Sequence, residues 1–158
     1  MTRAIYPGSF DPPTNGHIDI VERASRHFES VVIAVVTNAA KAPLFSIDER
    51  VSLLKGVLSH VGNVEVVPHA GLTVDLAKKH GIRVIVKGLR AASDLEYELQ
   101  QAQMNSSLAP DVDTFFIATN PQWSFISSSL IKDVARHGGS VEDYVPPAVT
   151  EALRRHSR

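Results

Sequence analysis

The chain has 158 residues, of which 44% are apolar and 21% charged, and its formal net charge at pH 7 is −1. We expect a single globular domain over residues 1–158, without the overall basic field that would favour a nucleic-acid polymer or an anionic membrane as a partner. The absence of cysteine excludes disulfides and thiolate metal sites; because no signal-peptide pattern or membrane-spanning apolar run accompanies it, we also expect a cytoplasmic protein.

Five apolar runs predict β-strands. A short run at residues 3–5, ending near Tyr6, is followed by VVIAVV (31–36), VEVV (64–67), RVIVKG (83–88) and TFFIAT (114–119). The second run is almost entirely β-branched, which is typical of a strand buried on both faces of a parallel sheet.

Helical patterns separate these strands. Ser46 with Glu49, and Ser93 with Glu96, have the spacing of a capping box ahead of apolar residues at helical intervals. The other predicted signals are a start at Thr14, a cap at Ser127, a stop at Gly138-Gly139, and a last, polar helix after Pro146-Pro147.

Strands that alternate with helices in so short a chain predict an α/β fold, a doubly wound sheet of five parallel strands with helices on both faces. We expect the Rossmann-like strand order 3-2-1-4-5. In such sheets ligands bind beyond the carboxyl ends of the strands, at the point where the strand order reverses. The loops after strands one, two, four and five are therefore the predicted location of a functional site.

The connection after the first strand, YPGSFDPPTNGHIDI, contains more special residues than a turn needs. It ends in Thr-x-Gly-His, with Thr14 at a helix start and His17 in the first turn. That turn offers unpaired N–H groups and a positive dipole end, and a histidine there can donate to a phosphate oxygen without changing its protonation state. Gly8 and Gly16 would allow a close backbone approach or a positive φ. By itself the motif more often marks an ordinary capped loop, but directly after strand one we interpret it as an anion site.

A second candidate segment follows the fifth strand. WSFISSS, residues 123–129, places three serines at a helix start, although one serine is enough for a cap. Hydroxyls and backbone donors together suit a chain of phosphates. Lys132, one turn further on, would face the same anion or solvent.

A third candidate segment, KGLR at residues 87–90, follows the fourth strand. Lys87 supplies a point charge, and Arg90 a planar fork that matches phosphate. On the next helix Asp94 and Glu98 are one turn apart, with Ala102 and Asn105 continuing the face. These carboxylates could hold a ribose hydroxyl, the adenine amino group or a metal shell, or form a solvated acidic face. Lys41, in the loop after the second strand, is weak evidence by itself.

Taken together, these segments resemble the phosphopantetheine adenylyltransferase family of the Thr-x-Gly-His nucleotidylyltransferases. The resemblance covers nearly the whole chain through AIYPGSFDP, TNGHIDI, LFSIDERV, GNVEVV, KGLRAASDLEYELQQAQMN and WSFISSSLIKDVARHGG. It implies transfer of AMP from ATP to 4′-phosphopantetheine, with Mg²⁺ as cofactor, dephospho-CoA and pyrophosphate as products, and a homohexameric assembly. Ser9 stands where threonine is usual in the family, and Lys87 where arginine is frequent.

The resemblance also implies roles for individual residues. A catalytic set would comprise His17, Lys41, Arg90 and Ser129. An ATP site would comprise Ser9, Phe10, His17, Gly88, Leu89, Arg90, Glu98, Trp123, Ser124, Phe125, Ile126, Ser127, Ser128 and Ser129. The 4′-phosphopantetheine site would comprise Ser9, Lys41, Thr73, Lys87 and Asn105. No residue is assigned as a metal ligand, and the seven histidines show no paired metal spacing.

Two alternatives remain open from the residues. A nicotinate mononucleotide adenylyltransferase would share the ATP site, but it would need polar groups for a pyridine and ribose that we do not recognise. A noncatalytic ATP-binding module would have no need of Lys41, Ser9 and Lys87 around a second anion. The sequence contains neither a P-loop nor a Gly-x-Gly-x-x-Gly dinucleotide motif.

Overall fold

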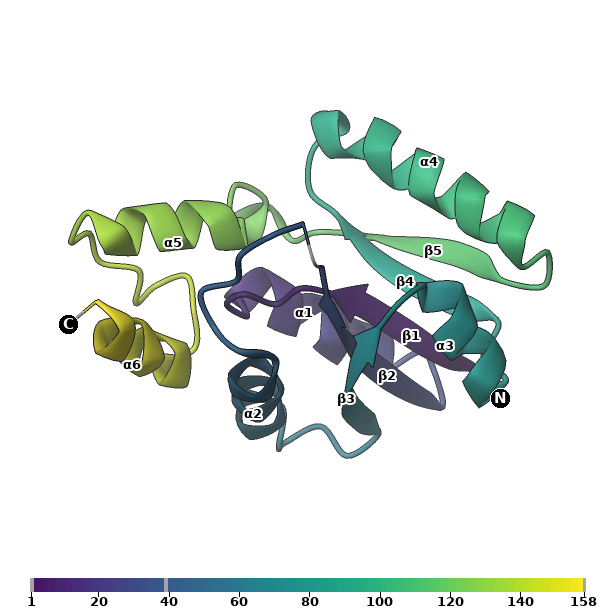
Figure 1. Cartoon of the computed structure of the whole chain (residues 1–158), viewed down its shortest axis with the longest axis horizontal. Helices are drawn as coiled ribbons and strands as arrows, with labels where there is room; N and C mark the ends of the chain where they lie inside the picture. The colour runs from purple at the N-terminus through teal and green to yellow at the C-terminus, as the bar shows by residue number, and fades with distance from the viewer. Residues whose placement is uncertain (1, 39, 158) are drawn as a thin grey trace.

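The computed structural model describes residues 2–38 and 40–157, except for the side chain of Ser93. Its five parallel strands have the order β3-β2-β1-β4-β5, which confirms the predicted fold class and strand order (Figure 1). The strands are β1 (Arg3–Gly8), β2 (Ser30–Thr37), β3 (Val64–Ala70), β4 (Val84–Leu89) and β5 (Asp113–Ala118). The helices are α1 (Asn15–Ser25), α2 (Ile47–Val57), α3 (Thr73–His80), α4 (Ala92–Leu108), α5 (Ser128–Arg136) and α6 (Pro147–His156).

Strand β1 lies at the centre of the sheet, between β2 and β4. It is longer than predicted, because its pairing with β2 continues through Pro7 opposite Ala34 and Gly8 opposite Val35. Proline is tolerated in β1 although it cannot donate to a ladder, and the strand delivers Ser9 directly to the carboxyl edge of the sheet.

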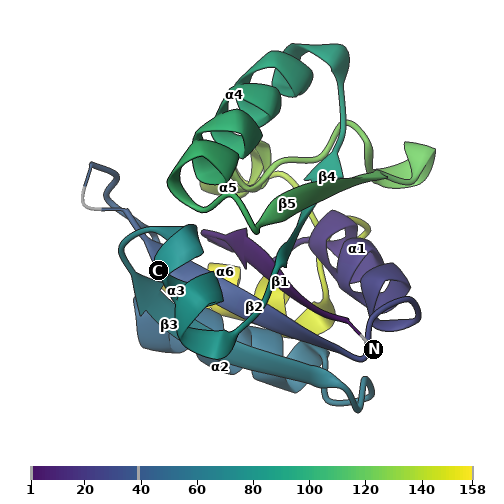
Figure 2. The same ribbon diagram turned by 90° about the vertical axis from the view of Figure 1, so that its right-hand side faces the viewer.

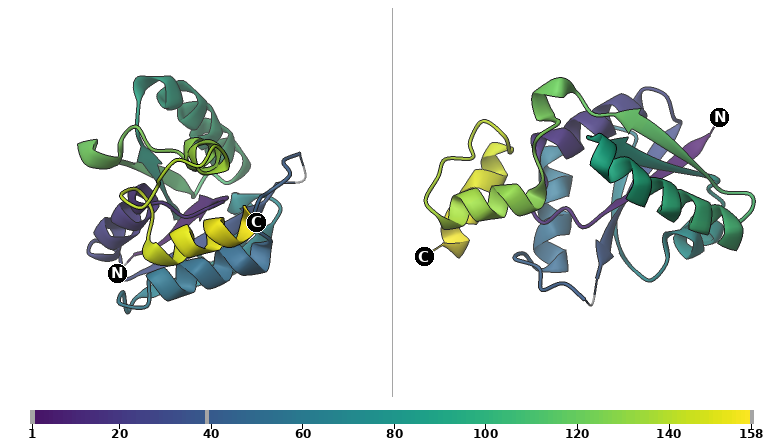
Figure 3. Two further views of the ribbon diagram at one scale, coloured as in Figure 1. Left: turned by 90° about the vertical axis from the view of Figure 1, so that its left-hand side faces the viewer. Right: turned by 90° about the horizontal axis from the view of Figure 1, so that it is seen from above.

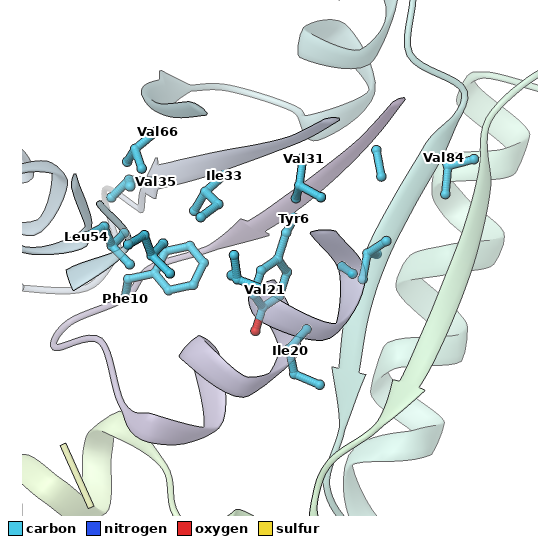
Figure 4. Close-up of a cluster of buried hydrophobic side chains, with 14 residues drawn as sticks. Tyr6, Phe10, Ile20, Val21, Val31, Ile33, Val35, Leu54, Val66 and Val84 are labelled. Atoms are coloured by element: carbon cyan, nitrogen blue, oxygen red, sulfur yellow. The ribbon is translucent and has the colours of Figure 1, made fainter. Parts of the chain in front are cut away.

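Helices cover both faces of the sheet, as expected for a doubly wound fold. On one face α1 and α2 pack against β1 and β2 through a buried cluster that includes Ile20, Val21, Leu54 and Ile33 (Figure 4). On the opposite face Val74 and other side chains of α3 pack against the alternate residues of the same strands. The strands are therefore buried on both faces, which explains their nearly continuous apolar sequences.

The C-terminal part of the chain forms a third apolar cluster beyond the carboxyl end of the sheet. Phe45, Ile126 and Ile131 pack there against Val149 and Leu153 of α6, and α6 lies alongside α2 (Figure 3). The last helix predicted after Pro146-Pro147 is confirmed, but it is not polar on all sides. Its apolar side chains are few, but they share one face, and that face is buried.

The helix starts agree with the sequence at three of the four predicted caps. Thr14 and Ser46 form capping boxes, and the Ser127 side chain accepts from the backbone N–H of Leu130. The cap predicted at Ser93 is wrong, because α4 already begins at Ala92, with Ala91 at the N-cap position.

Helix α3 was not predicted. Only five residues separate it from the end of the recognised VEVV run, and it has few apolar residues, so its pattern is weak. Gly81, in the left-handed conformation after two lysines and a histidine, is nevertheless a recognisable C-terminal signal. Within residues 2–38 and 40–157, no helix has the length and apolar character needed to cross a membrane.

Candidate active site

Loops from the carboxyl ends of the strands surround three adjoining hollows. The central hollow, about 280 Å³, lies between the loop after β1, the end of β4 and the start of α5. The α4 hollow, about 500 Å³, extends from the same strand ends to α4 and the start of α3. The loop hollow, about 610 Å³, lies beneath the connection between β2 and α2. Ser9 lines all three hollows, so the end of β1 is their meeting point.

The loop after β1 is held in an unusual conformation by aromatic packing. Phe10 has a positive φ of 49°, and its buried ring packs edge-on against Tyr6 and His17, with centroids 5.3 and 4.9 Å away. A Cβ on Gly8 would lie 3.0 Å from that ring, so a side chain at this position would force the ring to move by a few tenths of an ångström. Neither Gly8 nor Gly16 has a positive φ, and Phe10 carries the strain instead.

His17 is fixed in one orientation by the helix cap. The backbone N–H of Thr14 donates to Nδ1 of His17 over 3.0 Å. A backbone N–H can only donate, so Nδ1 must be the acceptor, and the proton of the neutral ring lies on Nε2. His17 lines the central hollow. The ring is therefore suited to act as a neutral hydrogen-bond donor there.

The surroundings of His17 keep the ring neutral. Burial lowers its pKa from the ordinary 6.5 to about 4, and the positive charges of Arg90 and Lys87 contribute in the same direction. At pH 7 the imidazole is uncharged, so it can donate to an anionic oxygen without first gaining or losing a proton.

Cations around the hollows are held by carboxylates. Lys87 Nζ lies 3.6 Å from Glu98 Oε2, and an Nη2 to Oδ2 distance of 3.4 Å joins Arg90 to Asp94. Lys132 Nζ lies 3.1 Å from Asp11 Oδ2, so this lysine does not simply face solvent. These ion pairs hold the cations in position before any ligand binds. Two of the cations, Lys87 and Arg90, line the central hollow.

Glu98 and Tyr6 bring an acceptor and a donor to the central hollow. Glu98 Oε2 is buried and has no hydrogen-bond partner within the described part of the chain, although Lys87 is near. Burial and the charge of Glu98 raise the pKa of the Tyr6 hydroxyl, so Tyr6 keeps its proton. An open acceptor and a protonated hydroxyl thus both line the central hollow.

The serine-rich segment forms the far wall of the central hollow. Ile126 and the three serines after it line the hollow, and Arg90 Nη1 donates to the carbonyl of Ile126 over 2.8 Å. Ser128 Oγ donates to the carbonyl of Pro12, also over 2.8 Å. These bonds connect the loops after β4 and β1 to the start of α5, as the sequence argument required.

The residues expected around a second anion gather in the α4 hollow. Ser9, Lys41, Thr73, Lys87 and Asn105 all line it. Lys41 and Lys87 come from the loop after β2 and from β4, on opposite sides of β1 in the sheet order. Glu98, Ala102 and Asn105 line it together, as predicted for one face of α4, but Asp94, the first residue of that predicted face, does not line it and instead pairs with Arg90.

Four of the predicted site residues line none of the three hollows: Leu89, Trp123, Ser124 and Phe125. Trp123 is partly buried against the third apolar cluster, and its Cβ would be 3.5 Å from a Cβ on Gly16. Phe125 is 58% exposed and packs edge-on against Tyr144. Their contact with a ligand stays a prediction.

Sequence reasoning missed two buried charges at the loop hollow. Asp11 and Arg50 line this hollow and are 4% and 3% exposed. Asp11 lies within a segment that we had quoted, between Phe10 and two prolines. Nothing in the sequence distinguished Arg50 from a solvated residue of an amphipathic helix.

The described residues contain no group of three histidines, aspartates or glutamates that could hold a metal ion. The carboxylates at the hollows, Asp11 and Glu98, each face a lysine. This donor set does not form a carboxylate cage, but it is compatible with a cation whose ligands are phosphate oxygens and water.

Comparisons with known proteins agree with this geometry. Residues 5–134 match the cytidylyltransferase-like family. The chain is 55% identical over 149 residues to the phosphopantetheine adenylyltransferase of Heliobacterium modesticaldum, covering 94% of this chain and 89% of that protein. It is 49% identical over 157 residues to the phosphopantetheine adenylyltransferase of Alkaliphilus metalliredigens, covering 99% of this chain and all of that protein.

A solved structure from Vibrio parahaemolyticus, provisionally assigned as a nicotinate-nucleotide adenylyltransferase, superposes with a TM-score of 0.75. The superposition covers all of this chain and 97% of that one, at 18% identity. At this identity the likeness shows a common fold and nothing about the acceptor.

Proposed function

This chain belongs to the phosphopantetheine adenylyltransferase family, and from that premise we propose that it transfers AMP from ATP to 4′-phosphopantetheine. The products are dephospho-CoA and pyrophosphate, in the biosynthesis of coenzyme A. The observation that carries the proposal is the place of Ser9, which lines all three hollows and shares the α4 hollow with Lys41 and Lys87. Noncatalytic ATP binding does not account for a second anion site. Nicotinate mononucleotide also carries a phosphate, so the preference for 4′-phosphopantetheine over it rests on the relatives that are 55% and 49% identical to this chain.

The reaction is a direct in-line displacement. An oxygen of the acceptor phosphate forms a bond to the α-phosphorus of ATP, and the bond from that phosphorus to the oxygen bridging to the β-phosphorus breaks. Pyrophosphate leaves with the electron pair. Because the acceptor is already an anion, no protein nucleophile or strong general base is needed, and the work of the site is to position the anions and stabilise their charge.

The acceptor binds in the α4 hollow. Ser9, Lys41 and Lys87 hold its phosphate, while Thr73 and Asn105 contact the pantetheine part. Two ammonium groups near one phosphate offset its repulsion from ATP. That repulsion is about 4 kcal/mol for two unit charges about 4 Å apart at an effective dielectric of 20. Lys87 gives charge without the bidentate fork of arginine.

ATP binds in the central hollow. His17 donates from Nε2 to the α-phosphate as charge develops there, and Arg90 and Ser129 hold the outer phosphates. Gly88, Leu89, Glu98 and residues 123–128 hold the nucleoside, together with the ring of Phe10 beneath His17. The open Oε2 acceptor of Glu98 fits a donor such as a ribose hydroxyl or the adenine amino group.

Mg²⁺ is the proposed cofactor, and it arrives with ATP. Phosphate oxygens and water would be its ligands, because the described carboxylates at the hollows face lysines. When bound, the ion neutralises phosphate charge. The residues of the chain position both substrates and donate hydrogen bonds to them.

We also propose a homohexamer that acts in the cytoplasm. The described residues of α4 are exposed or only partly buried, and Figure 2 shows this helix lying over β4 and β5 on the outside of the molecule. Its exposed apolar side chains are Leu95, Tyr97, Leu99, Met104 and Leu108, and Phe115 of β5 is 52% exposed. Contacts between subunits would cover such a surface. The lack of cysteine suits a reducing compartment.

The decisive experiment is a coupled pyrophosphate-release assay with ATP, Mg²⁺ and one acceptor at a time. We expect release with 4′-phosphopantetheine and only background with nicotinate mononucleotide or no acceptor. Release with nicotinate mononucleotide instead would reverse the choice of acceptor. ATP binding without release from either acceptor would show a noncatalytic module.

A further inference from the structure

The connection between β2 and α2, which carries Lys41, is bound to the β1 loop by two buried charges of opposite sign. On one side, both carboxylate oxygens of Asp11 accept backbone N–H groups of this connection: Oδ2 from Leu44 and Oδ1 from Phe45, each over 2.9 Å. Lys132 of α5 donates to the same Oδ2 over 3.1 Å. The β1 loop, the Lys41 connection and α5 thus meet at one carboxylate.

Arg50 makes the reciprocal connection with donors in place of acceptors. Its Nη1 donates to the carbonyl of Ser9 over 2.8 Å and to the carbonyl of Val36 over 3.3 Å. Its Nε donates to the carbonyl of Phe45 over 3.1 Å. The guanidinium therefore binds the carbonyl of Ser9, the end of β2 and the end of the Lys41 connection together.

The two side chains are poor choices for stability alone. Each is almost completely buried, and burying a charge is costly unless hydrogen bonds compensate for it. Phe45 already anchors the connection in the third apolar cluster. The charged groups add a defined geometry, because hydrogen bonds fix the distance and angle between the groups that they join more closely than apolar packing does.

From these contacts we infer that Asp11 and Arg50 are positioning residues, which fix Lys41 relative to Ser9 so that both reach the same phosphate. Both line the loop hollow together with Ser9 and Lys41. The inference rests on the proposed function, because it assigns the two charges to the acceptor side of the site. Neither side chain needs to touch a substrate.

The kinetic test uses Arg50→Lys, which keeps the charge but not the fork, and Asp11→Asn, which keeps the size and one acceptor. Arg3→Lys is the matched control. Arg3 is also an arginine that joins β1 to other segments, but it lies at the opposite end of β1, where it donates to Ser30 Oγ and to the carbonyl of His80. We expect the KM for 4′-phosphopantetheine to rise about tenfold or more in both test variants, the loss typical of one charge-assisted hydrogen bond. The KM for ATP should change less than about twofold in these variants. In Arg3→Lys, the KM for 4′-phosphopantetheine and the KM for ATP should both change less than about twofold.

A double-mutant cycle separates positioning from general destabilisation. In a Lys41→Met background there is no ammonium to position, so the loss of kcat/KM caused by Arg50→Lys should be at least about threefold smaller than in the wild type. Losses of equal size in the two backgrounds, or KM values for ATP and acceptor that rise together, would overturn the inference.

A second measurement does not depend on turnover. Hydrogen exchange of the Leu44 and Phe45 amides should be at least about tenfold faster in Asp11→Asn than in the wild type, and unchanged in Arg3→Lys. Unchanged exchange in Asp11→Asn would overturn the inference, even if Arg50→Lys failed to fold. Wild-type protein that releases no pyrophosphate with 4′-phosphopantetheine would instead refute the proposed function, whatever the exchange result.

Discussion

Replacement of His17 by alanine tests whether a neutral histidine stabilises charge that develops during the reaction. The ring is oriented by the Thr14 N–H at Nδ1, so the substitution removes one aimed donor, Nε2–H, from the central hollow. It also removes the acceptor for that N–H and the edge-on packing against Phe10. Catalytic and structural losses therefore have to be separated.

The two losses differ in size. Removing one aimed donor to a developing oxyanion costs about 10²–10³ in kcat, or roughly 2.7–4 kcal/mol. The lost half of the capping box and the lost aromatic contact together cost about 1–2 kcal/mol of stability, which lowers Tm by roughly 2–8 °C for a chain of this size. His17→Asn separates them, because its amide oxygen can replace Nδ1 as acceptor while its side chain is too short to place a donor at the Nε2 position.

Steady-state pyrophosphate release and ATP titration measure the outcome. We expect kcat to fall by about 10²–10³ in both variants, with ATP binding within a few-fold of wild type and with Tm restored toward wild type in His17→Asn. Since the pKa of His17 is about 4, roughly one molecule in a thousand has a charged ring at pH 7, and kcat should show no His17 titration between pH 6 and 9. Unchanged kcat with weaker ATP binding would make His17 a ground-state contact. A fall in kcat as the pH rises from 6 to 7 would show that the charged ring is needed.

Four further predictions concern the acceptor site, the pH dependence of stability, the metal ion and the assembly. Lys41→Met should sharply reduce kcat/KM for 4′-phosphopantetheine while the fold is unchanged and ATP binding stays within a few-fold of wild type; near-wild-type turnover would remove Lys41 from the site. Neutral His17 should contribute its full stabilisation above pH 6.5, and thermal denaturation should show this contribution disappearing as the pH falls toward 4, because the unfolded chain binds the proton more tightly. An equal pH dependence in His17→Asn would contradict this. A chelator should abolish pyrophosphate release and leave Tm unchanged, whereas a fall in Tm would indicate a metal held by the protein itself. Light scattering at micromolar concentration should give about six times 17.2 kDa, and a monomer mass would refute the hexamer.

Much of the fold could be predicted because the signals that specify it are local. The β-branched run at residues 31–36 and the capping box at Ser46 depend on neighbours within one turn or one strand, so their elements follow from the chain alone. The candidate loops could also be grouped, because the carboxyl ends of parallel strands meet at one edge. Helix α3 and the buried face of α6 were missed, since a short apolar stripe is weak until a sheet or a second helix covers it.

The chemical state of the site depends on contacts between segments far apart in sequence. The sequence predicted His17 at a helix start, and its donor nitrogen is set by the local cap at Thr14, three residues away. Its low pKa arises from burial and from Arg90 and Lys87, 73 and 70 positions away. Asp11 and Arg50 could not be distinguished from solvated charges, because only packing decides whether water or backbone groups surround a side chain. Local patterning thus determined which loops carry the chemistry. Tertiary structure decided the distances, the burial and hence the protonation state, because electrostatic interactions depend on position and on exclusion of water, which no local pattern contains.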